Sequence, residues 1–183
     1  MTESKPTITH ATREDVPHIL SLIHELAAYE HATSSVQATV DSLTATLRFA
    51  PTPTSKPTGQ GSVSSAANGH DYASPTGQVV GMALYFTNYS TWTGAPGVYL
   101  EDLFVRPEYR GRGYGTALIR ALALEARSIG GKRLEWSCLR WNEPSLKFYR
   151  SLGAVEKSDW TVLRADGEAF ERLADAAAGG VGE

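Results

Sequence analysis

Apolar residues near the N-terminus recur at three- and four-residue spacing, which predicts a helix with one buried face. Thr12 precedes this stretch, and the acidic residues Glu14 and Asp15 come directly after Thr12, as is typical of a capped helix start. Pro17 is tolerated because it lies near the start of the helix. Ile8 and Thr9 predict a short strand before the helix, and a weaker pattern predicts a second helix over residues 40–49. The apolar positions of the first helix are Val16, Ile19, Leu20, Ile23, Leu26 and Ala27.

The remainder of the chain alternates between apolar runs and amphipathic stretches. The apolar and alternating runs predict strands over residues 79–86, 98–105, 132–140 and 160–163. Helical spacing predicts helices over residues 113–128, 142–152 and 167–178. This order of elements predicts an α/β (α+β layered) fold, with a mixed, largely antiparallel central sheet flanked by helices.

Residues 50–76 differ from the rest of the chain because they are dense in Pro, Ser, Thr and Gly. Large apolar side chains are nearly missing there, so the segment cannot bury enough surface to offset the entropy of ordering it. We therefore expect a long low-complexity loop, with a strand near residues 70–73, inside a single domain that spans residues 1–178. Residues 179–183 are expected to form a flexible tail.

The composition of the 183 residues is ordinary for a globular protein, with 42% hydrophobic and 20% charged residues. A net charge of −3 favours cationic small molecules over nucleic acid as partners. The single Cys138 excludes an internal disulfide and agrees with a reducing, cytoplasmic location. The sequence has no membrane-spanning run, signal-peptide core or zinc-ligand pattern, so we expect no membrane association and no metal.

A glycine-rich run stands between the strand predicted over residues 98–105 and the helix that follows it. Unpaired backbone N–H groups and the helix dipole make such a helix start a binding site for anions. Neither a P-loop nor a dinucleotide fingerprint fits the run, but the pattern Arg/Gln-x-x-Gly-x-Gly/Ala does. A surface turn at the start of a helix is the alternative. The predicted pyrophosphate cradle consists of Arg110, Gly111, Arg112, Gly113, Tyr114 and Gly115.

Two adjacent carboxylates, Glu101 and Asp102, interrupt the same apolar strand. Burying carboxylates without partners costs several kcal/mol, so the pair requires a reason. Strand alternation predicts that the two side chains point to opposite faces, so that at most one lines a given pocket wall. A functional carboxylate is one reason, and a structural salt bridge to Arg106 or Arg110 is the other.

Four blocks resemble the GNAT acetyltransferase superfamily, and in particular its diamine (spermidine/spermine) and thialysine N-acetyltransferases. They are GMALYFTNYSTWTG, VYLEDLFV, RGRGYGTAL and WNEPSLKFYRSLGA, and LIHELAAYE is similar to that family's first helix. The resemblance implies a GNAT-like fold, acetyl-CoA as the cosubstrate and direct acetyl transfer to a primary amine of a small cationic acceptor. This acceptor is expected to be a polyamine, a diamine or a thialysine-like lysine analogue. It also implies a homodimer formed through exchanged C-terminal elements.

The resemblance further implies roles for individual residues in the cofactor half of the site. Tyr149 corresponds to the tyrosine that protonates the departing CoA thiolate, although a core aromatic residue on an amphipathic helix is the alternative. Asn142 corresponds to a residue that hydrogen-bonds the CoA arm, and it also suits a helix N-cap. The strand in this family splays from its neighbour, which leaves backbone N–H groups for the acyl carbonyl and the pantetheine arm at Leu103, Phe104 and Val105.

For the acceptor, Glu101 resembles the carboxylate that binds the amine and accepts its proton through water, and Asp102 is a second candidate. The further acceptor residues that the resemblance implies are Tyr29, Glu30, Trp92 and Trp160. Where polyamine enzymes carry a glutamate before the second tryptophan, this chain has Lys157-Ser158-Asp159, and Asp159 is the candidate substitute. Acetylation of peptide lysines and a non-catalytic acyl-CoA-binding module are the alternative functions.

Overall fold

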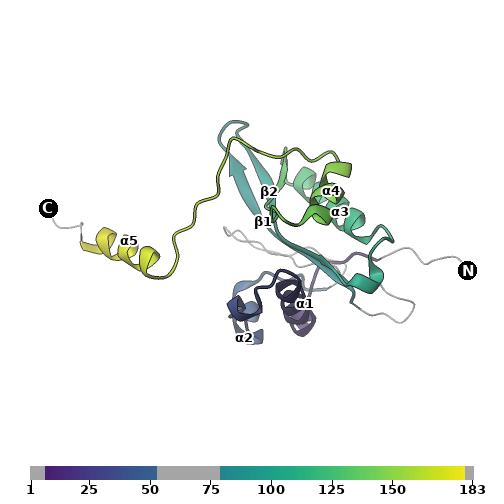
Figure 1. The fold of residues 1–183 in the computed structure, drawn as a ribbon, viewed down its shortest axis with the longest axis horizontal. Helices are drawn as coiled ribbons and strands as arrows, with labels where there is room; N and C mark the ends of the chain where they lie inside the picture. Colours follow the sequence, from purple (N-terminus) through teal and green to yellow (C-terminus); the bar gives the residue numbers. More distant parts are fainter. Residues whose placement is uncertain (1–6, 53–78, 180–183) are drawn as a thin grey trace, which may run out of the picture. The chain divides into compact units, whose positions relative to one another are not determined.

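Helix α1 (Val16–Tyr29) begins at a capped turn, as its sequence predicts (Figure 1). In the computed structural model, which describes residues 7–52 and 79–179, the buried Asp15 carboxylate accepts hydrogen bonds from the Thr12 N–H and hydroxyl, at 2.6 and 2.7 Å. The strand expected at Ile8 and Thr9 is wrong, because this segment forms no strand pairing within the described part of the chain. Two residues offer too few ladder hydrogen bonds to hold an independent strand.

The other helices keep close to their predicted bounds. The short helix α2 (Val40–Thr46) follows α1, and α3 (Tyr114–Ser128) follows the glycine-rich run. Short 3₁₀ turns flank them, at Arg13–Asp15, Thr33–Ser35 and Pro107–Tyr109.

Three strands form the sheet of the described residues, in the order β1-β2-β3. Strands β1 (Gly81–Ser90) and β2 (Ala95–Val105) pair antiparallel, whereas β3 (Leu134–Trp136) pairs parallel with β2. The sheet is therefore mixed, as expected. Both strands of the β1–β2 hairpin extend closer to their turn than the apolar runs indicate, because partner backbone groups are available up to Ser90 and Ala95.

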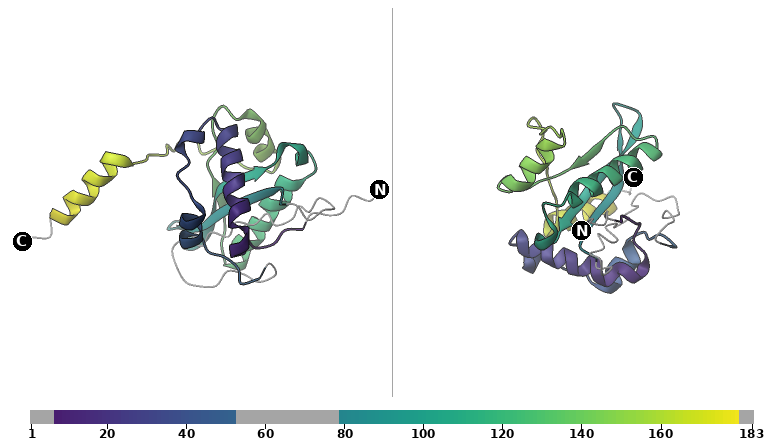
Figure 2. Two further views of the ribbon diagram at one scale, coloured as in Figure 1. Left: turned by 90° about the horizontal axis from the view of Figure 1, so that it is seen from below. Right: turned by 90° about the vertical axis from the view of Figure 1, so that its right-hand side faces the viewer.

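Helices cover both faces of this sheet. Met82 and Phe104, which are paired across β1 and β2, pack in one core cluster with α1 and α2, through residues such as Leu22 and Leu43. Helix α1 crosses in front of the strands in the left-hand view of Figure 2. Met82 and Leu84 of β1 both point toward α1. Because successive side chains of a strand alternate, Tyr85 points to the opposite face. Burial and the nearby Glu125 carboxylate of α3 both raise the pKa of Tyr85.

A charged clamp joins the end of α1 to the end of β2. The Arg106 guanidinium donates from Nε to both carboxylate oxygens of Glu25, at 3.1 Å each, and from Nη2 to Oε1 at 2.8 Å. Its Nη1 donates to the Val79 carbonyl at 2.9 Å. Because the hydrogen bonds to Glu25 favour the charged guanidinium, they raise the pKa of Arg106. The clamp fixes the last turns of α1 against the strand that carries Glu101 and Asp102.

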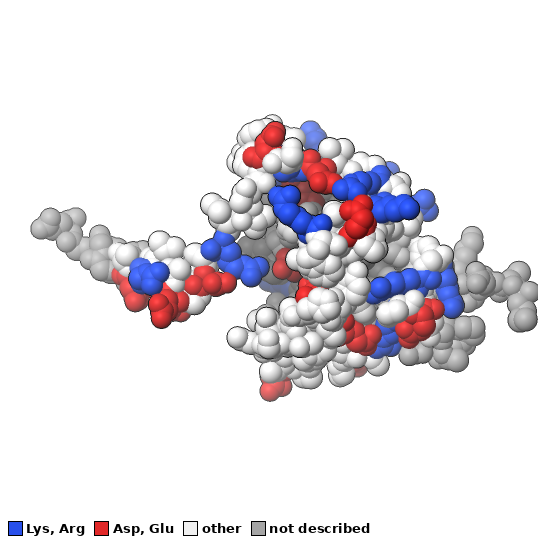
Figure 3. Space-filling view, in the orientation of Figure 1, with Lys and Arg blue, Asp and Glu red and all other residues white. Residues whose placement is uncertain are grey.

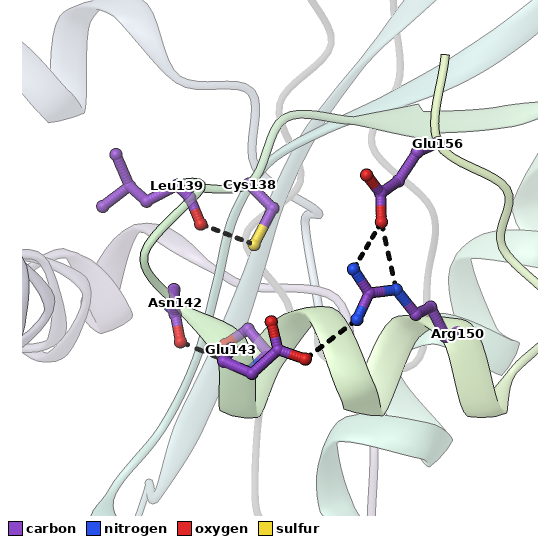
Figure 4. Close-up of polar contacts among 7 residues, drawn as sticks. Cys138, Leu139, Asn142, Glu143, Arg150 and Glu156 are labelled. Atoms are coloured by element: carbon purple, nitrogen blue, oxygen red, sulfur yellow. Dashed lines mark hydrogen bonds and ion pairs between the residues drawn. The ribbon is translucent and has the colours of Figure 1, made fainter. Parts of the chain in front are cut away.

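The contacts of the chain separate two compact units, Met1–Leu139 and Arg140–Glu183. The second unit contains α4 (Glu143–Ser151) and α5 (Gly167–Gly179), close to the expected bounds. Arg150 bridges Glu143, the first residue of α4, and Glu156, which lies beyond the end of the helix, with N···O distances of 2.9 and 2.6 Å (Figure 4). These two partners raise the pKa of Arg150.

The strand expected over residues 160–163 is wrong. These residues form no strand in the described part of the chain, and the side chains of Val162 and Leu163 are 81% and 89% exposed. Alternating apolar residues give a segment the ability to pair, but a strand also requires a partner, which the local sequence cannot supply. The strand expected near residues 70–73, and most of the loop expected over residues 50–76, lie outside the described residues.

Candidate active site

A β-bulge in β2 brings the two adjacent carboxylates to one face of the sheet. Asp102 pairs with Leu84 of β1, but the next β1 residue, Tyr85, pairs with Leu100, so Glu101 is the extra residue. Phe86 lies two residues after Leu84 on β1 and therefore shares the α1 face with it. Tyr99 pairs with Phe86 and stacks on it, so Tyr99 faces α1 as well. Glu101 follows two residues after Tyr99, and alternation places it on the same face.

Asp102 lies on that same face, because its partner Leu84 packs into the α1 core cluster. The expectation that Glu101 and Asp102 point to opposite faces is therefore wrong. One inserted residue shifts the alternation by one position, which turns every later side chain to the other face.

The two carboxylates differ in their surroundings. Glu101 is exposed, whereas Asp102 is half-buried. Burial, and to a lesser extent the negative charges of Glu101 and Glu30, together raise the pKa of Asp102 to about 6. Asp102 therefore holds a proton more tightly than an ordinary carboxyl group does, and its charged form is favoured when a cation binds beside it.

The end of α1 supplies two more of the expected acceptor residues. Tyr29 is the last residue of α1, and Glu30 is its C-cap. Burial raises the pKa of Glu30, and its charge acts on Asp102. The structure thus brings Tyr29, Glu30, Glu101 and Asp102 into one neighbourhood, although 70 residues separate the two pairs in the sequence.

The salt-bridge explanation for Glu101 finds no support among the described contacts. Arg106 pairs with Glu25 and with the Val79 carbonyl. Arg110 lies over the rings of Tyr29 and Phe104, at 5.1 and 5.5 Å from their centroids. Both arginines that were alternatives for a structural pair are thus engaged elsewhere.

The glycine-rich run has the geometry of an anion cradle. Gly111 and Gly113 have φ values of +75° and +82°, which residues other than glycine rarely adopt. A Cβ atom at either position would meet no described atom within 4 Å, so the space in front of the backbone is open. Gly113 is the N-cap of α3, and no described side chain caps this helix. The first N–H groups of α3 therefore lie where an anionic group can approach them.

Aromatic contacts hold the cradle in shape. The rings of Tyr109 and Tyr114 stack with centroids 6.4 Å apart, and the Arg112 guanidinium lies 5.4 Å from the Tyr109 ring centroid. Arg112 also donates to the Glu108 carbonyl at 3.1 Å. These contacts join the 3₁₀ turn before the cradle to the first turn of α3.

One edge of β2 is open beside the carboxylates. Strand β3 pairs with Val98, Tyr99 and Leu100 and then ends, while β2 continues to Val105. Among the described residues, no strand covers this edge from Glu101 onward. The segment that contains Leu103, Phe104 and Val105 is thus the place where an extended ligand could add to the sheet.

The structure separates Trp92 from the carboxylates of its own chain. Trp92 lies in the turn of the β1–β2 hairpin and is 87% exposed. Glu101 lies six positions along β2 from Ala95, at the base of this turn, which at the usual rise per residue is roughly 20 Å.

The remaining expected site residues belong to the second unit. Asn142 is buried, and its Oδ1 accepts a hydrogen bond from the Ser145 N–H at 3.3 Å, which confirms its role as the N-cap of α4 (Figure 4). Tyr149 is half-buried on α4, and its ring centroid lies 5.1 Å from that of Phe148. Asp159 and Trp160 are exposed in the segment between α4 and α5.

Comparison with known proteins identifies the family. The chain matches the acetyltransferase (GNAT) family over residues 38–154. The chain belongs to this family. Its resemblance to the GNAT acetyltransferases, and the fold expected from it, are thereby confirmed. The chain is an N-acetyltransferase of the GNAT family, whose members use acetyl-CoA.

Individual relatives cover nearly the whole chain. A thialysine N-epsilon-acetyltransferase of Bos taurus is 37% identical over 171 residues, which are 91% of this chain and 96% of the relative. The L-ornithine N5-acetyltransferase NATA1 of Arabidopsis thaliana is 29% identical over 194 aligned positions, covering 89% of this chain and 85% of the relative. An integron cassette protein from V. cholerae has the same fold, with a TM-score of 0.69, 23% identity and coverage of 93% and 98%.

The described residues carry no sign of a metal site or of a membrane span. No group of His, Cys, Asp and Glu residues with the arrangement of a metal site occurs in the described ranges 7–52 and 79–179. In the same ranges, no helix combines the length and hydropathy needed to cross a membrane.

The sequence predicts Asp102 only as a second candidate for the acceptor carboxylate, whereas the structure places it among the acidic residues at the end of α1. The contact between Arg110 and Tyr29 is not predicted from the sequence. The signal for Asp102 was its position directly after Glu101 in an apolar strand, but the bulge that turns it to the α1 face leaves no mark in the sequence. For Arg110, the motif drew attention to the glycines, whereas the side chain reaches back toward α1.

The raised pKa of Asp102 predicts how stability depends on pH. Because the folded state binds this proton more tightly than the unfolded state, the wild-type protein should lose stability as pH rises from about 4 to about 6. Asp102→Asn should abolish this loss and be more stable than wild type at pH 7 by up to about 2 kcal/mol. Urea unfolding at pH 4 and pH 7 measures the difference. Asp175→Asn, on the exposed surface of α5, is the control, and an equal pH effect of both variants would contradict the prediction.

Proposed function

We propose that this GNAT enzyme transfers the acetyl group of acetyl-CoA to the side-chain primary amine of a small cationic acceptor. Polyamines, diamines and thialysine-like lysine analogues are the acceptors of this class, and ornithine joins them through the name of a relative. The main support for this proposal is that Glu30, at the end of α1, lies near Glu101 and Asp102, which are on the α1 face of β2. The edge of β2 beside these carboxylates is not covered by β3. Three carboxylates of this kind attract an alkylammonium group, and the names of two relatives refer to amino acids with a distal amine.

The cradle at Gly111 and Gly113 fits the pyrophosphate of acetyl-CoA. The backbone there has no Cβ atom, the space in front of it is open, and the first N–H groups of α3 stand beside it. The open edge at Leu103, Phe104 and Val105 offers backbone groups to the pantetheine arm and to the thioester carbonyl. When bound, the thioester supplies an activated acetyl group.

The carboxylates prepare the acceptor. Glu101 and Glu30 hold the ammonium group, and Asp102, alone or through water, accepts the proton that this group must lose before its nitrogen can attack. The pKa of Asp102, raised by burial and by its acidic neighbours to about 6, makes it a better proton acceptor than an ordinary carboxylate. Tyr149 donates its phenolic proton to the sulfur as the C–S bond breaks and the N–C bond forms.

The negative net charge suits a cationic acceptor, whether a small amine or a lysine peptide. Basic and acidic side chains are interspersed over the face drawn in Figure 3, and the chain carries a net charge of −3. We retain peptide lysine as the second acceptor class.

Release of free thiol from acetyl-CoA, measured against thialysine, lysine, ornithine, putrescine, spermidine and a lysine peptide, tests the proposal. A kcat/KM for one of the small amines at least about tenfold above that for the peptide is expected. Preference for the peptide would replace the acceptor class. Binding of acetyl-CoA without turnover on any of these amines would contradict the proposed acceptor class.

We also propose a homodimer. Its support is the exposure of apolar side chains in the C-terminal segment, namely Val155, Trp160, Val162, Leu163, Phe170 and Leu173. Exposed apolar side chains in such number are typical of a surface that a partner covers. Light scattering coupled to size exclusion should give twice the mass of the chain, and a monomer would contradict the proposal.

A further inference from the structure

The Arg110 side chain turns away from the glycines of its own motif. Its Nε donates to the Val105 carbonyl at 2.8 Å, which directs the guanidinium back along the end of β2. There the guanidinium carbon lies 5.1 Å from the centroid of the Tyr29 ring and 5.5 Å from that of Phe104. These distances are those of cation–π contacts.

The ring that Arg110 contacts stands next in sequence to one of the proposed acceptor carboxylates. Tyr29 ends α1, and Glu30, the next residue, acts on the Asp102 carboxylate through its charge. One turn earlier, Glu25 is held by Arg106. Arg106 and Arg110 both come from the connection between β2 and α3, so this connection fixes the end of α1 at two successive turns.

We propose that Arg110 is a positioning residue of the acceptor site, which holds Tyr29 and thereby Glu30 beside Asp102, rather than a side-chain ligand of the cofactor phosphates. This inference rests on the proposed function for the identity of the acceptor wall. The backbone of Gly111, Gly113 and the first turn of α3 carries the anion site without the Arg110 side chain. The side chain acts on the acceptor through Tyr29 and does not need to touch the reacting atoms.

Arg110→Lys separates the two roles. The lysine keeps the positive charge near the cradle but loses the planar stack and the Nε donor, which an ammonium group cannot reproduce. We expect the KM and the calorimetric Kd for thialysine to rise about five- to tenfold, while the Kd for CoA changes by less than about twofold. Arg120→Lys, an exposed exchange of the same kind on α3, is the matched control and should change neither.

A cycle with Tyr29 tests whether Arg110 acts through that ring. In a Tyr29→Leu background, Arg110→Lys should add less than about twofold to the Kd for thialysine, because both changes break the same contact. In a Tyr29→Phe background, which keeps the ring, the full effect of Arg110→Lys should remain. A full effect in the Tyr29→Leu background would overturn the inference.

The other outcomes are equally decisive. A rise in the Kd for CoA alone would assign the side chain to the phosphates and overturn the inference while leaving the acetyltransferase function intact. An equal rise in both constants, or no change in either, would also overturn it. A wild-type protein that binds CoA but neither binds nor acetylates thialysine or the other amines would instead refute the proposed acceptor class, and the positioning role with it.

Discussion

Replacing Tyr149 with phenylalanine should lower kcat for acetyl transfer by about 100-fold or more, because general acid catalysis contributes about that factor. Tyr149 is half-buried on α4, and phenylalanine keeps its ring and its packing against Phe148. The loss should therefore fall on kcat, whereas the Kd for acetyl-CoA should stay within about twofold of wild type. Steady-state kinetics and calorimetry measure the two quantities.

Tyr89→Phe is the matched control for this variant. Tyr89 is 61% exposed on β1, so removing its hydroxyl group should leave kcat unchanged. Equal losses of kcat and of acetyl-CoA affinity in Tyr149→Phe would indicate a structural role. Unchanged kcat would remove Tyr149 from the mechanism and leave the thiolate to be protonated by water.

Gly113→Ala should weaken acetyl-CoA binding at least about tenfold. At a φ of +82°, a Cβ atom costs about 1–2 kcal/mol of backbone strain. The same Cβ atom would occupy the open space in front of the cradle, where the pyrophosphate is expected to approach the first N–H groups of α3. Calorimetric titration with CoA measures the loss directly, without the need for an acceptor.

Gly130→Ala is the control that separates the effect of backbone strain from the effect of blocking the anion cradle. Gly130 follows α3, has a φ of +74°, and also has no described atom within 4 Å of a built Cβ. Its replacement should cost a similar amount of stability but leave CoA affinity within about twofold. If both glycine variants bind CoA equally well, the anion site is elsewhere.

The sequence predicts most of the helical framework because the signals for helices are local. The apolar spacing of α1, the Thr12–Asp15 cap and the Asn142 N-cap depend only on residues within a few positions of each other. The glycine-rich run is local in the same sense, and the structure confirms its position at the start of α3. Such features are decided by backbone geometry that neighbouring residues determine themselves.

The features that sequence reasoning missed depend on contacts between distant segments. The bulge at Glu101 arises from the register between β1 and β2, and only this register turns Asp102 toward α1. The alternating residues 160–163 form no strand for the opposite reason, since no strand in the described part of the chain pairs with them. The Arg110–Tyr29 contact joins residues that are 81 positions apart, and no local pattern indicates it.

The open edge of β2 also has a consequence for handling the protein. An uncovered strand edge is a template on which a strand of another molecule can assemble, and proteins commonly prevent this with charges and bulges. The bulge at Glu101 and the charges of Glu101 and Asp102 both lie on the part of β2 that β3 does not cover. Neutralising these carboxylates therefore removes a barrier against self-association, so variants such as Glu101→Gln should show more aggregation on storage even where their folding stability is unchanged.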